Sequence, residues 1–307
     1  KDGEVPREDY KIFMAMSRRI GQDSKGNSVF VLDGNGNSTG VLNHDLNEIA
    51  DAYIDFLSGN EHQKSEYIFT IKKSEVKDHI NINPQHYSPK LNATLDSVLA
   101  FDNKDNWATT TVGQLEAGIR IYIGPRWNSA SIKVDNPTDT SNLVPYLTAN
   151  AALELRRFTV KWLDARKANP QQRQCIDMLK IHEGDILISR SGTIGKVTYA
   201  TKDLAENYIV SDDLVRIRVK DANLRAYLLA YFTSSTALAL MLLDEYGSVQ
   251  QHLQPRHIQE MLIPVPDDWS LAQDMIDAGN MFIKAMEDMS KADRKIRTQG
   301  FDALIAE

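Results

Sequence analysis

The sequence predicts an α+β fold that combines a twisted, mainly antiparallel sheet with helices and ends in a long amphipathic helix. Short strand-like segments recur between residues 119 and 219. The last of them, 214–219, alternates apolar and basic residues, which is typical of a half-buried strand. Residues 270–306 carry apolar side chains at roughly heptad spacing among charged ones, which predicts the long helix.

Composition limits the classes of protein to consider. The chain has 307 residues and a net charge of −7, with 42% hydrophobic and 25% charged residues, as in ordinary soluble globular proteins of one large or two smaller domains. A single cysteine, Cys175, excludes an internal disulfide framework and a cysteine-based zinc site within one chain, and we expect a reducing, cytoplasmic location. No stretch approaches the ~20 apolar residues of a membrane span. Because the first residue is Lys1, we expect a processed chain or a fragment of a longer one.

The first hundred residues predict a small unit followed by a bridge. Apolar residues and a basic end indicate a short helix over 9–19. A strand is expected at 29–32 between two turns rich in glycine and asparagine, and a helix from 43 to 59. The sequence from residue 60 to residue 105 is polar and shows no regular pattern apart from one strand-like segment at 67–71, so we interpret it as a bridge.

A second unit begins at residue 107. Its predicted strands are 119–123, 185–188, 195–199, 208–210 and 214–219. An apolar helix is expected over 224–243, and the proline-containing segment 263–266 ends the unit before the long C-terminal helix.

Enzyme chemistry is weakly represented in the sequence. No Gly-x-Ser-x-Gly elbow is present, and the seven histidines show no metal-ligand spacing, so we assign no catalytic residue and no metal ligand.

Charge is distributed unevenly along the chain. Residues 110–260 hold 18 Lys+Arg and 16 Asp+Glu, a net +2, whereas the remainder holds 17 and 26, a net −9. A near-neutral middle between acidic ends can still carry a basic face for nucleic acid, although solvated acidic helices explain the ends equally well.

The most informative stretch is Gly184-Asp-Ile-Leu-Ile-Ser-Arg-Ser-Gly-Thr-Ile-Gly-Lys196. A buried strand leads into a turn with two glycines and then into a second strand. Hydroxyl groups, backbone amides and cationic side chains at such a turn can bind the phosphates of a nucleic-acid backbone. The predicted phosphate-binding residues are Arg190, Ser191, Thr193 and Lys196. The alternative is a plain hairpin whose glycines only supply positive φ.

A second polar cluster spans residues 245–256. Amide side chains read adenine and guanidinium groups read guanine through paired hydrogen bonds in the major groove. The predicted DNA-binding residues here are Ser248, Gln250, Gln251 and Arg256, with Gln254 beside them. The alternative is a solvated polar loop after a helix. We expect Arg190, Lys196 and Arg256 to share one surface, unless Arg190 is tied to a carboxylate such as Asp185 or Asp212.

These two stretches, together with Gly247 and Ile263-Pro-Val-Pro266, resemble the target recognition domain of a type I restriction-modification specificity subunit. Trp107-Ala-Thr-Thr-Thr-Val-Gly-Gln-Leu115 resembles the opening of that domain. The final helix is similar to the helical spacer of the family, which packs on another helix. The resemblance covers about 107–307.

The N-terminal part of the chain resembles a segment of a different protein, namely the C-terminal tail of an adenine-N6 DNA methyltransferase (modification) subunit. Ile12-Phe-Met-Ala-Met16, Ile20-Gly-Gln-Asp-Ser-Lys-Gly26 and Asp45-Leu-Asn-Glu-Ile-Ala50 carry this likeness. The catalytic Asn/Asp-Pro-Pro-Tyr/Phe motif of that family is absent from the sequence. Catalysis is therefore not carried over, and we expect the chain alone to transfer no methyl group.

The two resemblances imply four parts. These are a methyltransferase-tail-like segment (1–62), a bridge (63–106), a DNA target recognition domain (107–267) and a long spacer or packing helix (268–307). They imply a sequence-specific DNA recognition module whose partners are double-stranded DNA, a methyltransferase catalytic domain or subunit, and a second copy or specificity subunit held through the C-terminal helix. The chain itself is expected to bind no cofactor, and S-adenosylmethionine would belong to the catalytic domain. The alternative is a helix-mediated protein-interaction module without DNA binding.

Overall fold

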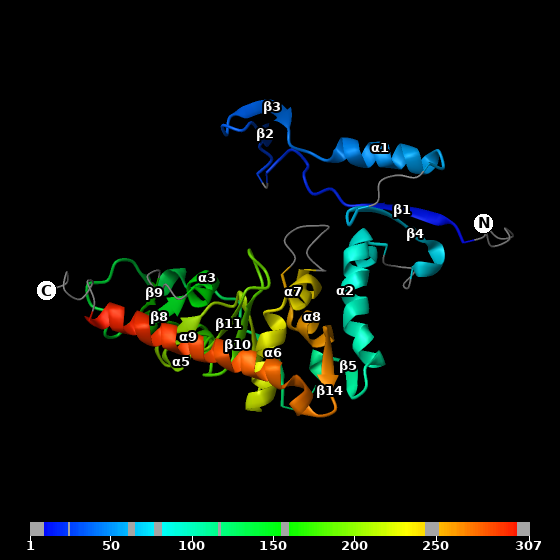
Figure 1. The fold of residues 1–307 in the computed structure, drawn as a ribbon. Coiled ribbons are helices and arrows are strands. Elements are labelled where there is room, and N and C mark those ends of the chain that lie inside the picture. The colour runs from blue at the N-terminus through cyan, green and yellow to red at the C-terminus, as the bar shows by residue number, and fades with distance from the viewer. Residues whose placement is uncertain are drawn as a thin grey trace. The chain divides into compact units, whose positions relative to one another are not determined.

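The computed structural model describes residues 9–23, 25–60, 65–76, 82–115, 118–154, 160–242 and 252–299 (Figure 1). The chain divides into two compact units, Lys1–Thr94 and Leu95–Glu307. The boundary falls within helix α2 (Pro89–Leu99). Helices and mainly antiparallel sheets occur together, so the predicted α+β class is confirmed.

The first unit is built on two short antiparallel pairs of strands. Strand β1 (Lys11–Ala15) pairs with β4 (Ile68–Lys72), and β2 (Phe30–Leu32) pairs with β3 (Ser38–Leu42). Helix α1 (Leu46–Leu57) packs on β1. The helix predicted over 9–19 is wrong, because this segment forms β1. Pairing with β4 buries Met14 against Phe69, and this tertiary contact outweighs the local helical pattern.

The second unit contains a four-stranded, fully antiparallel sheet in the order β11-β10-β13-β6. Its strands are β6 (Arg120–Ile123), β10 (Ile186–Ser189), β11 (Val197–Tyr199) and β13 (Leu214–Arg218). All four were predicted, but β13 is not half-buried as its alternation suggested. Residues from Leu214 to Ile217 are all buried, including Arg216. Both faces of this sheet are therefore covered.

A second four-stranded sheet has the order β12-β8-β9-β7. Its strands are β7 (Lys133–Val134), β8 (Val144–Leu147), β9 (Val160–Leu163) and β12 (Ile209–Val210). The pair β12–β8 is parallel and the other two pairs are antiparallel. Strands β7, β8 and β9 were not predicted, because two to four residues are too short to show a periodic pattern.

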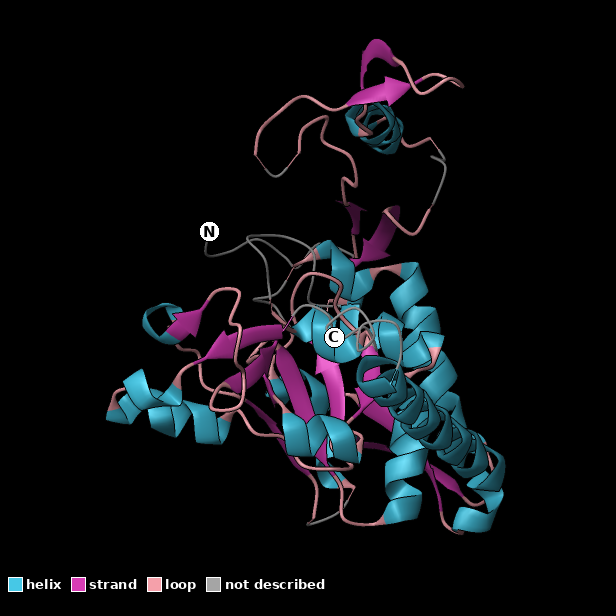
Figure 2. Cartoon of the chain, turned by 90° about the vertical axis from the view of Figure 1, so that its left-hand side faces the viewer, coloured by secondary structure: helices cyan, strands magenta, loops and turns pink. Residues whose placement is uncertain are grey.

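Helices surround these sheets in the second unit (Figure 2). The shorter ones are α3 (Ala149–Leu153), α4 (Pro170–Met178), α5 (Lys202–Asn207) and α8 (Pro255–Glu260). The helix predicted over 224–243 is two helices, α6 (Ala222–Phe232) and α7 (Ser235–Met241). The hydroxyl of Ser234 accepts a hydrogen bond from the backbone N of Ala237 at 3.1 Å, so it starts a new helix where the first one ends.

The long C-terminal helix is confirmed as α9 (Gln273–Gln299), which runs beside α6, α5 and β11 (Figure 1). It packs tightly on α6 at Gly279, where a Cβ atom would lie 2.0 Å from the backbone O of Ala226. A last antiparallel pair joins β14 (Leu262–Pro266) to β5 (Trp107–Thr111). No helix within the described ranges is long and apolar enough to cross a membrane.

Candidate nucleic-acid interface

The turn between β10 and β11 has the glycine geometry that its sequence predicts. Gly192 and Gly195 have φ values of +68° and +81°, a region that side chains with a Cβ rarely adopt. Ser189 closes the turn, because its Oγ accepts a hydrogen bond from the backbone N of Lys196 at 2.9 Å. Thr193 and Lys196 are exposed, so a hydroxyl and an ammonium group are available to a ligand at this turn.

Arg190 occupies the start of the same turn but points inward, with 8% of its surface exposed. Its Nε donates to the backbone O of Leu253 at 3.2 Å, and its Nη1 donates to the backbone O of Asp212 at 3.4 Å. The partner groups are therefore carbonyls, not the carboxylates of Asp185 or Asp212 that the sequence suggested. The geometry gives Arg190 a positioning role, and a direct contact with phosphate stays a prediction.

The two predicted DNA-binding loops meet at Arg190. The backbone N of Leu253 donates to the backbone O of Arg190 at 3.0 Å, which completes a two-way link between segments 63 residues apart. Helix α8 begins two residues after Leu253 and carries Arg256 as an exposed residue. Ser248, Gln250 and Gln251 lie outside the described residues. The expected closeness of the two loops is thus present at the end of the second loop.

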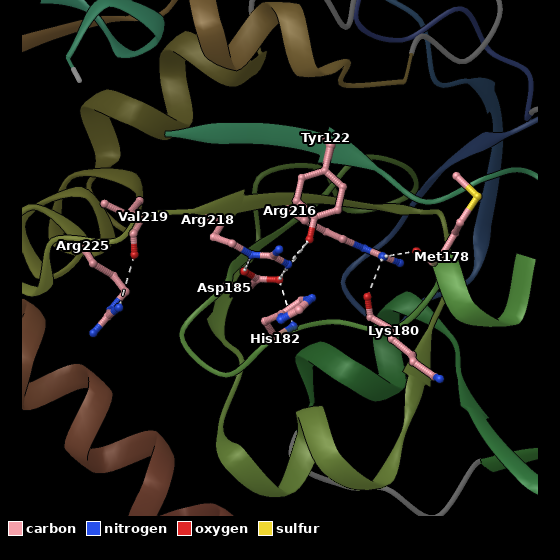
Figure 3. A network of polar contacts seen from close by, with 9 residues as sticks. All are labelled: Tyr122, Met178, Lys180, His182, Asp185, Arg216, Arg218, Val219 and Arg225. Carbon is pink, nitrogen blue, oxygen red and sulfur yellow. Dashed lines mark hydrogen bonds and ion pairs between the residues drawn. The ribbon is translucent and has the colours of Figure 1, made fainter. Parts of the chain in front are cut away.

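A buried polar network around Asp185, at the end of β10 opposite to this turn, was not anticipated (Figure 3). The Asp185 carboxylate is fully buried and accepts hydrogen bonds from Arg218 Nε at 2.8 Å, Arg218 Nη2 at 3.0 Å and Tyr122 Oη at 3.2 Å. Burial, followed by the nearby Asp185 carboxylate, raises the pKa of Tyr122. Every oxygen of Asp185 is engaged, so this carboxylate is a structural anchor and not a free base. The basic positions of segment 214–219 are visible in the sequence, but their partners are remote in it, so the sequence does not reveal the network.

Arg216 joins the two four-stranded sheets from inside the core. Its Nη1 donates to the backbone O of Met178 at 3.1 Å, at the end of α4, and its Nη2 donates to the backbone O of Val210 at 3.0 Å, in β12 (Figure 3 shows the Met178 contact). Gly124 leaves room for it, because a Cβ there would lie 2.9 Å from Nη2. Burial lowers the pKa of this guanidinium. Arg216 therefore acts as a link between strands and is not available to a ligand.

The exposed side chains of the two loops suit contacts with phosphates better than covalent catalysis. Thr193, Lys196 and Arg256 are accessible around the joined loops, and Ser191 is partly accessible. Among the described residues, no group of three or more His, Cys, Asp or Glu side chains lies close enough to hold a metal ion. Hydroxyl, ammonium and guanidinium donors on adjacent loops can position a nucleic-acid backbone and reach base edges.

Comparison with known proteins gives one match to a family. Residues 123–276, half of the chain, match the model of the type I restriction modification DNA specificity domain. No curated protein sequence matches the chain.

Solved structures give weaker likenesses. A chain from a structure that describes complex assembly and conformational transition of the type I R-M system is 15% identical, with a TM-score of 0.39, and the match covers 83% of this chain and 66% of that one. The HsdS subunit from Thermoanaerobacter tengcongensis is 14% identical, with a TM-score of 0.38, and the match covers 70% of this chain and 51% of that one. The type I restriction-modification S subunit from M. genitalium is 13% identical, with a TM-score of 0.38, and the match covers 66% of this chain and 46% of that one. The present chain thus spans less than two thirds of each of these chains.

Proposed function

This chain belongs to the family of type I restriction modification DNA specificity domains, and we propose that it is the sequence-specific DNA recognition module of an adenine-N6 DNA methyltransferase or restriction-modification system. The family match carries the proposal. It runs from the end of β6 to Ile276 in α9, so it includes most of the residues of both four-stranded sheets and the two joined loops.

We assign the two loops different tasks. Ser191, Thr193 and Lys196 contact phosphates and hold the domain in register on the duplex. Arg256 and the neighbouring Ser248, Gln250 and Gln251 read base edges in the major groove. Arg190 keeps the two loops in contact through its bonds to Leu253, so it acts through its neighbours.

Methyl transfer belongs to a partner in this proposal. A methyltransferase catalytic domain or subunit would hold S-adenosylmethionine and extrude the target adenine, because a base inside the duplex is out of reach of the methyl donor. The motif that holds the flipped adenine is missing from this sequence. We therefore expect the purified chain to incorporate no labelled methyl group into DNA, and methylation by the chain free of contaminating enzyme would contradict this.

A helix partner is the second element of the proposal, and it is favoured by an apolar stripe along α9. The stripe repeats at a spacing of seven and is at least half exposed at most of its positions, which are Met275, Phe282, Met289 and Ile296. Acidic Asp274 and Asp277 lie near its start, and basic Lys291 and Lys295 lie near its end. Two copies of α9 packed antiparallel would bring opposite charges together, so we propose a second copy as the partner. One recognition domain reads one half-site, and such a pair would read a bipartite target.

Binding to DNA tests the main proposal. A pool of random-sequence duplexes is selected on the purified full chain, and the enriched duplex is compared with a scrambled one in gel-shift titrations at two salt concentrations. We expect tighter binding to the enriched duplex and affinity that falls with salt. The triple variant Arg190→Ala, Lys196→Ala, Arg256→Ala should lose affinity. No binding to any duplex would leave the protein-interaction alternative.

A further inference from the structure

Positive charge in this chain is concentrated away from the predicted DNA-binding loops. Residues 120–180 hold ten Lys+Arg and five Asp+Glu, a net +5 in a chain of net −7. Residues 181–260, which include both loops, hold eight Lys+Arg and ten Asp+Glu, a net −2. The basic stretch runs from β6 through β7, β8, β9 and α4, so it contains most of the second sheet.

The loop region also has few cations that could reach a ligand. Arg190 and Arg216 are buried, and Arg218 is bound to the Asp185 carboxylate. That leaves Lys196 and Arg256 as exposed cations in the two loops. Of these two, the proposed function assigns only Lys196 to a phosphate, and one cation supplies little of the counterion release that drives sequence-independent binding to a duplex.

Five exposed cations in and beside the second sheet supply what the loops lack. We name this set the basic edge, and it consists of Arg126, Lys161, Arg166, Lys167 and Arg173. Arg166 and Lys167 share one carboxylate, that of Asp164, so the three together still carry a net charge of +1. Arg126, Lys161 and Arg173 form no ion pair within the part of the chain that the structure describes.

The segments that carry the basic edge are fixed to one another. The Gln172 side chain donates to the backbone O of Asn128 at 3.1 Å and to the Oγ of Ser131 at 3.0 Å, which ties the first turn of α4 to the segment after Arg126. Arg173 Nε donates to the backbone O of Ala168 at 3.1 Å, beside Lys167.

Packing below these links holds the same segments in place. The backbone N of Asp164 donates to the backbone O of Ile132 at 2.8 Å. Below these contacts lies one shared core that includes Ile132, Leu163 and Ile176, with Trp127 packed against it. A rigid support keeps the cations in place before binding, and this lowers the entropy lost on binding.

We propose that the basic edge contacts the phosphate backbone of duplex DNA and supplies most of the sequence-independent affinity of this protein, while the two loops supply discrimination. The inference rests on the proposed function, since it names a second surface for the same ligand. Exposed Lys and Arg side chains on a fixed support suit a polyanion, and their contacts with phosphates carry no sequence information.

Salt dependence of binding tests this inference in the full chain. The variant Arg126→Ala, Lys161→Ala, Arg173→Ala removes the three cations of the basic edge that have no carboxylate partner among the described residues. A control variant, Lys25→Ala, Lys202→Ala, Lys220→Ala, removes the same charge from exposed sites elsewhere. Each lost phosphate contact lowers the slope of log affinity against log salt by about 0.9. We expect the slope to fall by roughly 2–3 in the first variant on any duplex and to stay unchanged in the control.

A second measurement uses the unaltered chain, so it does not depend on how a variant folds. Lysines are acetylated with and without a random-sequence duplex, and the modified sites are measured by mass spectrometry. We expect the duplex to slow acetylation of Lys161 and Lys167 and to leave Lys25 and Lys220 unaffected.

The outcomes separate this inference from the proposed function. Wild-type binding with an unchanged slope in the first variant and no protection of Lys161 would overturn the basic edge, and the DNA recognition module would stand. Equal slope changes in both variants would also overturn it, because net charge alone would then explain the effect. Absence of wild-type binding to any duplex would remove the proposed function and the basic edge with it.

Discussion

Charged residues inside the second unit act as structural links between strands and segments that are remote in sequence. The Asp185 carboxylate faces Arg218 through two hydrogen bonds, and Arg216 binds only backbone carbonyls. A buried ion pair contributes little net stability compared with an apolar pair, but removal of one partner leaves an uncompensated charge. The alternation of 214–219 predicts the strand from sequence. It cannot predict that its basic residues point into the core, because their partners at 122, 178, 185 and 210 are remote in sequence.

Asp185→Leu should destabilise the protein by about 2–4 kcal/mol, because Arg218 would remain without its carboxylate. The double variant Asp185→Leu, Arg218→Leu should recover part of that loss. Urea unfolding measures the free energy of unfolding of both, with Asp177→Leu as a control, since the Asp177–Lys180 pair is exposed and should change stability by no more than about 0.5 kcal/mol. A double variant less stable than Asp185→Leu would contradict the coupling.

Two tyrosines of α6 predict a loss of stability at alkaline pH. Tyr227 donates to the backbone O of Pro264 at 2.6 Å, Tyr231 donates to that of Leu262, and burial raises the pKa of Tyr227 to about 12 and that of Tyr231 as well. A folded pKa above the unfolded value of about 10 means that the unfolded chain ionises first as pH rises. The stability contributed by the neutral phenols is therefore complete below pH ~10 and is lost as pH rises from about 10 to about 12.

For Tyr227 this loss should reach about 1–3 kcal/mol by pH ~12. Urea unfolding at pH ~8 and pH ~11 measures it in the wild type. Tyr227→Phe should cost about 1 kcal/mol at pH ~8 through the lost hydrogen bond, and it should show a smaller further loss at pH ~11. An equal decrease between the two pH values in both proteins would refute the assignment to Tyr227.

At the scale of elements, sequence patterns predicted most of the longer helices and strands. They failed where contacts between remote segments determine the secondary structure. The strands of the first four-stranded sheet were predicted, as were α1 and α9. The segment 9–19 became β1 because β4 pairs with it, and 224–243 divided into two helices at Ser234. Strands β7 to β9 were missed because each is short and exists through its neighbours in the sheet. Local propensity is a weak prior when tertiary pairing buries the same side chains.

Helix α9 depends on one glycine for its contact with α6. A methyl group at Gly279 would lie 2.0 Å from the backbone O of Ala226, and neither helix backbone can move aside without loss of packing. Gly279→Ala should therefore destabilise the protein by about 2 kcal/mol or more, although alanine is the better helix former. Thermal or urea unfolding measures this against Asn280→Ala, an exposed neighbour that should be neutral or stabilising. A Gly279→Ala protein as stable as the wild type would show that the two helices can separate at little cost.

At the scale of the whole molecule, the candidate interface was only partly predictable. The turn at 190–196 and its closeness to the second loop follow from the glycines and from the family resemblance, whereas the inward position of Arg190 depends on carbonyls at 212 and 253. The basic edge escaped detection because its cations are scattered from 126 to 173 between acidic residues. Only the packing of the second sheet brings those segments together.

Attachment of α9 to the second unit has a consequence for assembly. The hydroxyls of Thr201 and Ser290 lie 3.1 Å apart in the core, and Arg297 donates to the Oη of Tyr208 at 2.9 Å, so the helix is fixed along its length. A second copy that packed on the exposed stripe would then hold its own recognition unit in a defined direction. Two half-sites would be bound at a fixed separation, since neither helix is free to turn.

Charge placed within the stripe should therefore separate the copies without unfolding them. Met275 and Met289 are 53% and 50% exposed and lie on the stripe, whereas Met281 is 73% exposed and lies outside it. Met275→Glu, Met289→Glu should shift the mass measured by light scattering from two copies to one and reduce affinity for a duplex with two half-sites more than for one with a single half-site. Met281→Glu should leave the mass unchanged. A wild-type protein that stays a single copy at all concentrations would refute self-pairing, and the stripe would then belong to a different specificity subunit.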